Sequence, residues 1–361
     1  MKSARQRIAV GMSGGTDSST IAWMLAQEGH DVLGLTLRLW PESSDRSSSD
    51  HLENAGKVCG KLGIEHHTVT LYDAFEETIV TPFVEAYASG STPSPCVLCN
   101  PTIKFGVMLD EARRLGCDAL ATGHYARIEQ AASGNYRLRR GVDSTKEQSY
   151  FLNRLSQVQL ARARFPLGGY RKTDVSALAL KEGLIPEAHG ESQDLCFVPD
   201  GDYASFVCRR RPDLAQPGEI VTTEGRILGE HQGVFRYTIG QRKGLGLGGG
   251  PWYVVELDPV GNRVVVGRED ETRGDTVWVQ DLNWIESPPT EGEALKVAAQ
   301  LRYNMRPVEA TIRVTGPDQV LVEVHSPVSA ITPGQAAVFY DGEYVVGGGW
   351  IQRPPLEEVS A

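Results

Sequence analysis

The chain has 361 residues, more than a single domain usually contains, so two or three domains are expected. Hydrophobic residues make up 40% of it and charged residues 23%, an ordinary globular composition, and no apolar run approaches the roughly 20 residues of a membrane span. The net charge of −10 argues against a protein that coats nucleic acid by bulk attraction, although a local basic groove remains compatible with it.

The N-terminus offers no apolar stretch typical of a secretory signal, because Met1–Arg5 runs straight into polar Gln6 and Arg7. We therefore expect a cytoplasmic protein. The first predicted strand is Ile8–Val10, and the glycine-rich run Ser13–Ser19 follows it before a helical pattern begins.

This glycine-rich run predicts a phosphate site. Adjacent glycines let the backbone approach a ligand closely. Asp17 or Ser18 can cap the following helix, whose N–H groups then face an anion. No Gly-Lys-Ser/Thr follows, so the run is not a P-loop. A flexible Ser/Gly linker is the alternative interpretation.

The run resembles the SGGxDS loop of the PP-loop ATPases, which split ATP to AMP and pyrophosphate while adenylating a substrate. This resemblance implies ATP and Mg²⁺, with the metal bound through ATP. The ATP-binding residues that it implies are Gly11, Met12, Ser13, Gly14, Gly15, Thr16, Asp17, Ser18, Leu37, Gly123 and His124.

The next elements alternate between strand and helix. Predicted strands are Asp31–Leu39, His66–Thr70 and Ala119–Thr122. One predicted helix ends at Leu62, and four others cover Asp73–Tyr87, Thr102–Leu115, Tyr150–Leu160 and Asp174–Glu182. Loops are predicted at Pro41–Asp50 and Ser89–Pro95. Such alternation predicts a Rossmann-like α/β domain with a parallel sheet, and ligands at the carboxyl ends of its strands.

From Pro217 onward the composition changes to short alternating stretches rich in Gly, Pro, Val and Thr. The predicted strands include Trp252–Val255, Arg263–Val266, Thr276–Val279 and Ala310–Val314. This pattern of short strands indicates β-rich modules, of which the last is a small barrel. We expect a catalytic domain at 1–205, a small central domain at 206–272, a C-terminal β-barrel at 273–353 and a loose tail at 354–361.

Three of the six cysteines stand out. Cys96 and Cys99 have C-x-x-C spacing between a loop and a predicted helix, where the helix dipole favours thiolate, and Cys196 lies far downstream. In a long chain without a secretory signal, this pattern favours redox or metal chemistry over a disulfide framework.

Along nearly its whole length, the chain resembles the bacterial tRNA-specific 2-thiouridylases, which place sulfur on the wobble uridine of certain tRNAs. The matching segments follow one another in family order: Ser13–Ser18, Cys96–Phe105, Ala121–Arg127, Lys146–Leu152, Ser192–Phe197, Arg236–Gly246 and Ser329–Ile351. The resemblance implies a PP-loop domain, a small central domain and a C-terminal β-barrel.

The resemblance also implies a mechanism. ATP adenylates uridine O2, and Cys196 receives a persulfide sulfur from a donor protein such as a cysteine desulfurase or a sulfur relay protein. That sulfur attacks C2 as AMP leaves. Cys99 then helps to release sulfide or closes a transient disulfide with Cys196.

One position departs from the family pattern, because many members carry an acid/base aspartate where this chain has Cys96. The acid role therefore does not carry over. Three thiolates from Cys96, Cys99 and Cys196 with an open fourth position could instead hold a [4Fe–4S] cluster that binds sulfide. The sequence leaves the cluster and the cluster-free persulfide route as alternatives.

Contacts with tRNA are expected from polar and basic residues in the matching segments. The residues assigned to the tRNA or its target base are Lys104, Arg127, Lys146, Gln148, Ser149, Tyr150, Arg242, Lys243, Arg302 and Tyr303. Gln148 could bond a uracil edge and Tyr150 could stack on it; a helix start with core aromatics is the alternative. A second basic cluster comprises Arg162, Arg164, Arg171 and Lys172.

Two rival functions remain open. An amide-forming PP-loop ligase would not need the paired cysteines, and a non-enzymatic nucleotide or Fe–S sensor of RNA would not release pyrophosphate in response to tRNA. The run Gly244–Gly249 formally satisfies GxGxxG, but Pro251 and Trp252 follow it where a helix should begin, so no dinucleotide site is expected there.

Overall fold

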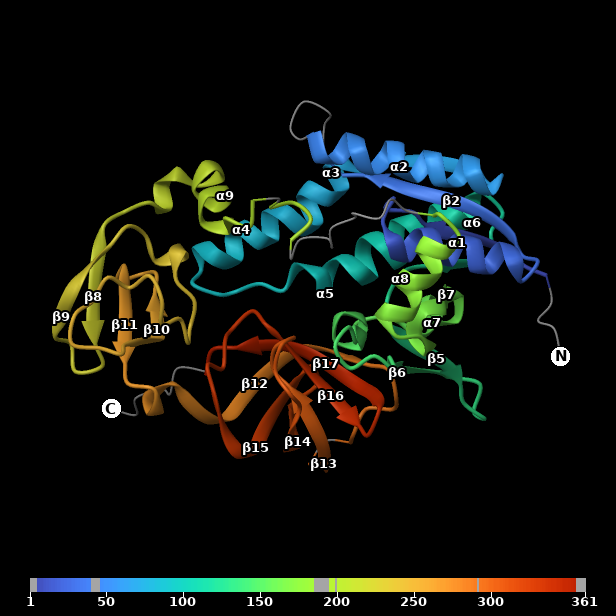
Figure 1. Ribbon diagram of the computed structural model, residues 1–361. Helices are drawn as coiled ribbons and strands as arrows, with labels where there is room; N and C mark the ends of the chain where they lie inside the picture. The colour runs from blue at the N-terminus through green and yellow to red at the C-terminus, as the bar shows by residue number, and fades with distance from the viewer. Residues whose placement is uncertain (1–4, 40–45, 185–194, 199, 291, 355–361) are drawn as a thin grey trace. The chain divides into compact units, whose positions relative to one another are not determined.

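The computed structural model describes residues 5–39, 46–184, 195–198, 200–290 and 292–354 (Figure 1). The chain divides into two compact units. The first comprises Met1–Ile79, Cys96–Ser192 and Glu343–Val346, and the second Val80–Pro95, Gln193–Gly342 and Gly347–Ala361. Among the described helices, none combines the length and the apolar character needed to cross a bilayer.

The first unit is built on a five-stranded parallel sheet, which confirms the predicted α/β class. Its strands are β1 (Arg7–Gly11), β2 (Asp31–Arg38), β3 (Glu65–Thr70), β4 (Ala119–Ala121) and β7 (Ala163–Arg164). They are ordered β3-β2-β1-β4-β7, so the strand order reverses between β1 and β4. In open α/β sheets a ligand crevice forms at the carboxyl ends of the strands at such a point. The crevice is therefore expected beside the loops that follow β1 and β4.

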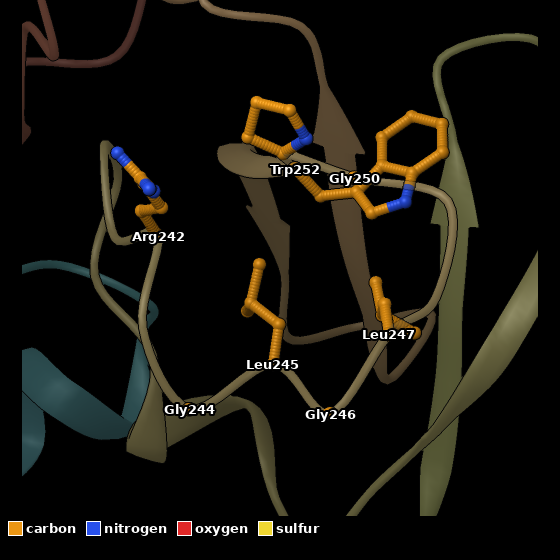
Figure 2. A pocket seen from close by; sticks show the side chains of 8 residues that line it. Arg242, Gly244, Leu245, Gly246, Leu247, Gly250 and Trp252 are labelled. Atoms are coloured by element: carbon orange, nitrogen blue, oxygen red, sulfur yellow. The ribbon is translucent and has the colours of Figure 1, made fainter.

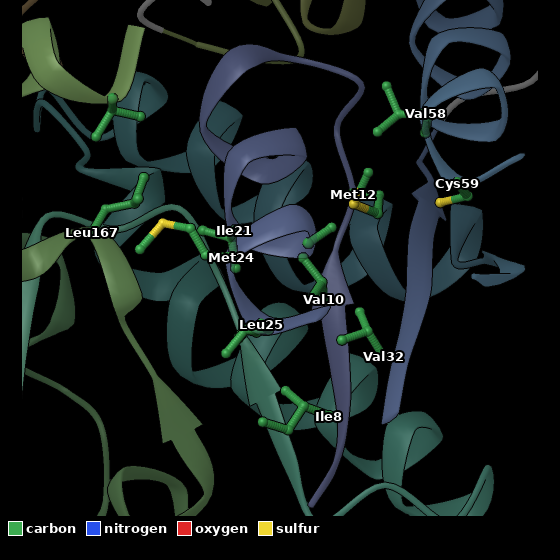
Figure 3. Close-up of a cluster of buried hydrophobic side chains, with 14 of the residues drawn as sticks. Ile8, Val10, Met12, Ile21, Met24, Leu25, Val32, Val58, Cys59 and Leu167 are labelled. Carbon is green, nitrogen blue, oxygen red and sulfur yellow. The ribbon is translucent and has the colours of Figure 1, made fainter. Parts of the chain in front are cut away.

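One face of this sheet is covered by three helices, α1 (Thr16–Gln27), α2 (Arg46–Leu62) and α8 (Lys172–Lys181). Ile8 and Val10 of β1 pack with Ile21 of α1 and Val58 of α2 in a single buried cluster (Figure 3). Val175 of α8 belongs to the same cluster. Burying an aliphatic side chain of this kind contributes about 1.5–3 kcal/mol. The cluster therefore fixes the start of α8 relative to the start of α1.

The expected loop at Pro41–Asp50 is partly wrong, because α2 already begins at Arg46 and residues 40–45 lie outside the described ranges. The predicted helix Asp73–Tyr87 is present with a widened middle. It consists of α3 (Tyr72–Phe75), the π-helical stretch η1 (Glu76–Val80) and α4 (Thr81–Ala88).

The helix predicted from Thr102 begins seven residues earlier. The structure has α5 (Pro95–Cys99), the π-helical stretch η2 (Asn100–Met108) and α6 (Leu109–Arg114). Proline is well suited to the first turn of a helix, where a missing N–H costs nothing. Cys96 and Cys99 therefore lie inside the helix start and not in a loop before it.

The predicted helix Tyr150–Leu160 is wrong as a single element. A 3₁₀ turn, η3 (Ser149–Leu152), is separated from α7 (Gln157–Arg162), which begins at a capping box between Ser156 and Gln159. The hairpin β5 (Ala126–Gln130) and β6 (Tyr136–Arg140) completes this part together with η4 (Pro166–Gly169). Tyr344 and Val345 also belong to the first unit and pair with β6.

The second unit contains α9 (Tyr203–Arg210), a four-stranded sheet and a barrel. The four-stranded sheet is ordered β10-β11-β8-β9, from β8 (Gly218–Thr222), β9 (Ile227–His231), β10 (Tyr253–Asp258) and β11 (Arg263–Gly267). Short 3₁₀ turns lie at η5 (Pro212–Leu214), η6 (Val234–Arg236) and η7 (Asp270–Thr272). Ile220, Leu245, Trp252 and Val264 share one buried core, so this sheet forms a module of its own.

The barrel is closed, as expected. Its strands are β12 (Arg273–Trp284), β13 (Ala294–Gln300), β14 (Val308–Gly316), β15 (Gln319–Ser329), β16 (Ala336–Asp341) and β17 (Tyr344–Gln352). They run in the order β12-β15-β14-β13-β16-β17, and β12 pairs with β17 to close the ring. Closure leaves no unpaired strand edge among these six strands.

Candidate functional site

The loop after β1 is held by its own serine hydroxyls. The backbone N–H of Ser13 donates to Ser18 Oγ over 3.2 Å, and Ser18 Oγ and Ser19 Oγ lie 3.2 and 2.8 Å from the carbonyl oxygen of Gly15. Gly14 has φ +73°, and a Cβ there would lie 2.8 Å from Asn54 Cβ. Only glycine fits this position, and the loop is closed tightly against α2.

The helix that follows is not capped as predicted. Gly15 is the N-cap of α1 and has no side chain that could cap the helix, so the expected capping by Asp17 or Ser18 is wrong. The N-cap residue therefore leaves the N–H donors of the first turn without a side-chain cap. A bound anion would meet those donors and the positive end of the helix dipole.

Asp17 has two partners instead. Lys172 Nζ lies 2.7 Å from Asp17 Oδ1 and 2.8 Å from Oδ2, and the hydroxyl of Tyr125 donates to Oδ1 over 3.0 Å. By sequence, Lys172 falls in a basic cluster with its neighbours Arg171 and Arg164. The structure gives Lys172 a partner outside that cluster, because its ammonium group lies at the glycine-rich loop.

The loop after β4 approaches the same helix. A Cβ at Gly123 would lie 3.0 Å from Asp17 Cβ, so the two loops meet at the switch point of the sheet. Leu37, half-buried near the end of β2, lies on the neighbouring strand. The implied ATP-binding residues of the three strand ends thus lie at one edge of the sheet.

His124 is buried between two polar partners. Its Nδ1 lies 2.8 Å from Thr122 Oγ1 and its Nε2 lies 3.4 Å from Lys104 Nζ. An ammonium group only donates, so Nε2 accepts and Nδ1 carries the proton. Burial, reinforced by the charge of Lys104, holds the pKa of His124 well below its usual range. The imidazole is therefore neutral.

The cysteine-bearing helix reaches this edge through Lys104, which η2 carries five residues after Cys99. Five residues of helix span roughly 7 Å along the axis. Cys96 and Cys99 are half-buried and lie three residues apart, so both thiols project from one side of the helix. Asn100 beside them is 1% exposed, and its Nδ2 donates to the carbonyl oxygen of Phe151 over 2.9 Å.

Cys196 is exposed and belongs to the second unit. Ser192, Gln193 and Asp194 of its motif lie outside the described residues. Within the described ranges, no group of three or more His, Cys, Asp and Glu side chains is arranged to hold a metal ion. Because Cys96 and Cys99 belong to the first unit, the three-cysteine ligand set stays a prediction.

The segment assigned to the target base is mostly inside the protein. Tyr150 and Ser149 are fully buried, and Gln148 Oε1 accepts a bond of 3.0 Å from the backbone N–H of Tyr125. These contacts agree with the alternative interpretation, a helix start with core aromatics. Lys146, in the turn before them, is half-buried.

Several basic residues serve the fold. Arg127 donates to the carbonyl oxygen of Arg140 over 2.7 Å and pairs with Glu343 at 3.4 Å. Arg162 and Arg164 also donate to main-chain carbonyls. In the barrel, Arg302 is exposed and Tyr303 is half-buried.

Arg242 stands at a cavity of about 360 Å³ in the central module, lined also by Leu245, Leu247 and Trp252 (Figure 2). The glycines of the GxGxxG-like run form part of its wall, in an irregular segment that no helix follows, as expected. Arg242 and Lys243 are both exposed, and neither side chain forms an ion pair within the described part of the chain.

Comparison with known proteins covers nearly the whole chain. Residues 6–200 match the family described as tRNA methyl transferase HUP domain, residues 204–268 its PRC-barrel domain, and residues 274–351 the aminomethyltransferase β-barrel domain. A tRNA-specific 2-thiouridylase, MnmA 1, of Caldanaerobacter subterraneus subsp. tengcongensis is 45% identical, with 96% of this chain and 98% of that protein covered. The MnmA of Geobacter metallireducens is 43% identical, with 98% and 99% covered.

Solved structures are more distant. A U34-tRNA thiolase, NcsA, of Methanococcus maripaludis with its [4Fe–4S] cluster is 20% identical, covering 59% of this chain and 67% of that one, with a TM-score of 0.36. A similarity of that size supports no conclusion about the function of this chain.

Proposed function

The chain belongs to the tRNA-specific 2-thiouridylase family, and on that basis we propose that it thiolates C2 of the wobble uridine of tRNA in the cytoplasm, at the expense of ATP. The observation that carries the proposal is the identity of 45% over 96% of the chain. The geometry agrees with it, because the loops after β1 and β4 meet at the switch point of a parallel sheet.

ATP is the first substrate. Uridine O2 is a poor leaving group, so O2 attacks the α-phosphorus of ATP, pyrophosphate departs and adenylated uridine forms. The donors around Ser13–Ser18 suit the pyrophosphate, and the expected Mg²⁺ would reach the site with ATP. Neutral donors and a helix N-terminus stabilise negative charge as it develops on the leaving group.

The sulfur step needs a nucleophile that also leaves easily. In the persulfide route, the terminal sulfur of a Cys196 persulfide attacks C2 and AMP leaves, which joins the base to Cys196 through a disulfide. The Cys99 thiolate then attacks Cys196 Sγ, frees the 2-thiouridine and forms a Cys99–Cys196 disulfide, which an external thiol must reduce. The persulfide comes from a donor protein that carries activated sulfur.

The alternative route uses cluster-bound sulfide. Cys96 and Cys99 lie on one helical turn and would supply two thiolates, with Cys196 as the third. When bound, such a cluster would supply an open iron that holds the sulfide. Cys96 distinguishes the two routes, because only the cluster route needs its thiolate.

An anaerobic preparation should be assayed for iron, acid-labile sulfide and tRNA thiolation beside a Cys96→Ser variant. The persulfide route predicts that iron-free protein thiolates tRNA with a persulfide donor and that Cys96→Ser retains this activity. About four irons per chain, with iron and activity both lost in the variant, would establish the cluster route.

Cys99→Ser and Cys196→Ser variants test the function itself. We expect both to lose multiple-turnover thiolation while tRNA still stimulates pyrophosphate release. Pyrophosphate release without any tRNA thiolation by the wild-type protein, unchanged in both variants, would favour the amide-forming ligase. No pyrophosphate release from the wild-type protein with any unmodified tRNA would favour the sensor.

A further inference from the structure

Lys172 lies at the glycine-rich loop, 155 residues from it in sequence. Its ammonium nitrogen is 2.7 and 2.8 Å from the two carboxylate oxygens of Asp17, which is in the first turn of α1. The Lys172 side chain is 20% exposed and that of Asp17 is 30% exposed, so the pair is shielded from bulk water but can be reached by a ligand.

Three contacts hold the start of α8 and the carboxylate of Asp17 in place, and through them the ammonium group of Lys172. The backbone N–H of Lys172, the first residue of α8, donates to Asp143 Oδ2 over 2.9 Å. Val175, one turn further along α8, packs into the core cluster beside Ile21 of α1. The hydroxyl of Tyr125 donates to Asp17 Oδ1 over 3.0 Å. The lysine is thus positioned before any ligand arrives.

The loop itself supplies only neutral donors, the serine hydroxyls and backbone N–H groups, and it carries a carboxylate at Asp17. A triphosphate with one Mg²⁺ retains a net charge of about −2, so Asp17 alone would repel it. In a P-loop the cation next to the phosphates is a lysine that follows the glycines, and this chain has none there. Lys172 supplies a positive charge at the same place.

We propose that Lys172 is the phosphate-binding lysine of this ATP site, with Asp17 as the residue that positions it. An ammonium group has three donors, and Asp17 occupies two of them, so the third can reach a phosphate oxygen while the ion pair stays intact. The contact serves ATP and, after the adenylation step, the departing pyrophosphate. This assignment rests on the proposed function, because ATP must be the ligand of the loop.

The test compares ligands with and without phosphate. Dissociation constants of ATP, inorganic pyrophosphate and adenosine are measured on the full-length wild-type protein and on Lys172→Met, Lys172→Arg and Lys181→Met. Lys181 ends the same helix and its side chain is 78% exposed, so its variant is the matched control for the removal of an α8 lysine.

We expect Lys172→Met to raise the dissociation constants of ATP and pyrophosphate on the order of 10- to 100-fold, the scale of one charge-assisted bond. Adenosine affinity should stay within about twofold, Lys172→Arg should recover part of the loss, and Lys181→Met should match the wild type.

Three results would overturn the assignment. An equal loss for ATP and adenosine would show that Lys172 only shapes the loop, and unchanged ATP affinity in Lys172→Met would show that it does not contact phosphate. Either result leaves the proposed thiolation intact when the wild-type protein binds ATP. A wild-type protein that binds neither ATP nor pyrophosphate would overturn the proposed function as well.

Discussion

At the scale of single residues, His124 shows how burial decides protonation. The side chain is 7% exposed and faces the ammonium group of Lys104, so both surroundings disfavour imidazolium. In the unfolded chain the same imidazole would titrate near its ordinary pKa of about 6.5. The folded state therefore binds fewer protons than the unfolded state below that pH, and acid must weaken the fold at this position.

We predict that His124 lowers the free energy of unfolding by about 1.4 kcal/mol between pH 7.5 and pH 5.5. The sign follows from the lowered pKa: stability is complete above about pH 6.5 and is lost as the pH falls below it. Denaturant unfolding of wild type and His124→Gln at both pH values measures this contribution. The difference between the two proteins cancels the contribution of His66, because both contain it. Burial also lowers the pKa of His66.

His325 provides the control. It is exposed on β15, with Nε2 3.0 Å from Thr311 Oγ1 and Nδ1 3.7 Å from Glu309, so His325→Gln is the matched variant for removing a histidine from the surface. Equal pH dependence in wild type and His124→Gln would contradict the prediction.

At the scale of elements, the helix from Pro95 to Arg114 explains why sequence patterns misplace boundaries. A Pro/Ser-rich stretch usually indicates a loop, but Pro95 is the first residue of α5. Pro101 then cannot donate to residue 97 and would crowd its carbonyl, and the helix widens into η2. The Gln159 amide donates to the carbonyl oxygens of Pro101 and Phe105 over 2.7 and 3.0 Å. These contacts come from a distant helix, so no local pattern predicts them.

The contact between the glycine-rich loop and α2 gives a second prediction, for Gly14→Ala. Gly14 and Gly29, just beyond the other end of α1, both have positive φ, at +73° and +89°. A Cβ at Gly29 meets nothing within 4 Å, whereas at Gly14 it would meet Asn54 Cβ at 2.8 Å. Gly29→Ala should therefore lower the free energy of unfolding by about 1 kcal/mol, from backbone strain alone. Gly14→Ala should lower it by a further steric cost of roughly 1–3 kcal/mol.

Chemical denaturation of the two variants checks this difference, and equilibrium dialysis with ATP checks its consequence. We expect Gly14→Ala also to lose ATP affinity, because α2 and the loop must move apart. Equal destabilisation of both variants would show that the loop does not press on α2.

At the scale of the whole molecule, the sequence predicted the architecture better than the contacts of the site. Periodicity and composition were enough for the parallel sheet, the short-stranded second half and the closed barrel, because each depends on local patterns repeated over many residues. The motifs also located the loops at Gly14 and Gly123. The sequence placed Lys172 only in a basic cluster, because its partner Asp17 is 155 residues away and the packing of α8 on α1 joins them.

The last prediction concerns the charge of the molecule as a whole. A protein with a net charge of −10 repels tRNA at long range, so binding must depend on a few local cations. Arg242 and Lys243 are suited to this role, because both are exposed without an ion pair in the described part of the chain and Arg242 borders the central cavity. A double Arg242→Glu, Lys243→Glu variant should raise the KM for tRNA by about 10-fold or more, while kcat at saturating tRNA stays within about twofold.

Salt dependence identifies the cause of that change. Removing one cation that neutralises a phosphate should reduce the slope of log K against log salt by about 0.9, so the double variant should bind tRNA with a slope lower by roughly two. Arg226→Glu is the control, since Arg226 is exposed in the turn between β8 and β9 of the same module. The double variant reverses two charges and Arg226→Glu reverses one. If the rise in log KM per reversed charge is the same in both, the effect comes from net charge alone. If neither raises it, tRNA does not contact this face, because a reversed charge next to a bound phosphate cannot leave affinity unchanged.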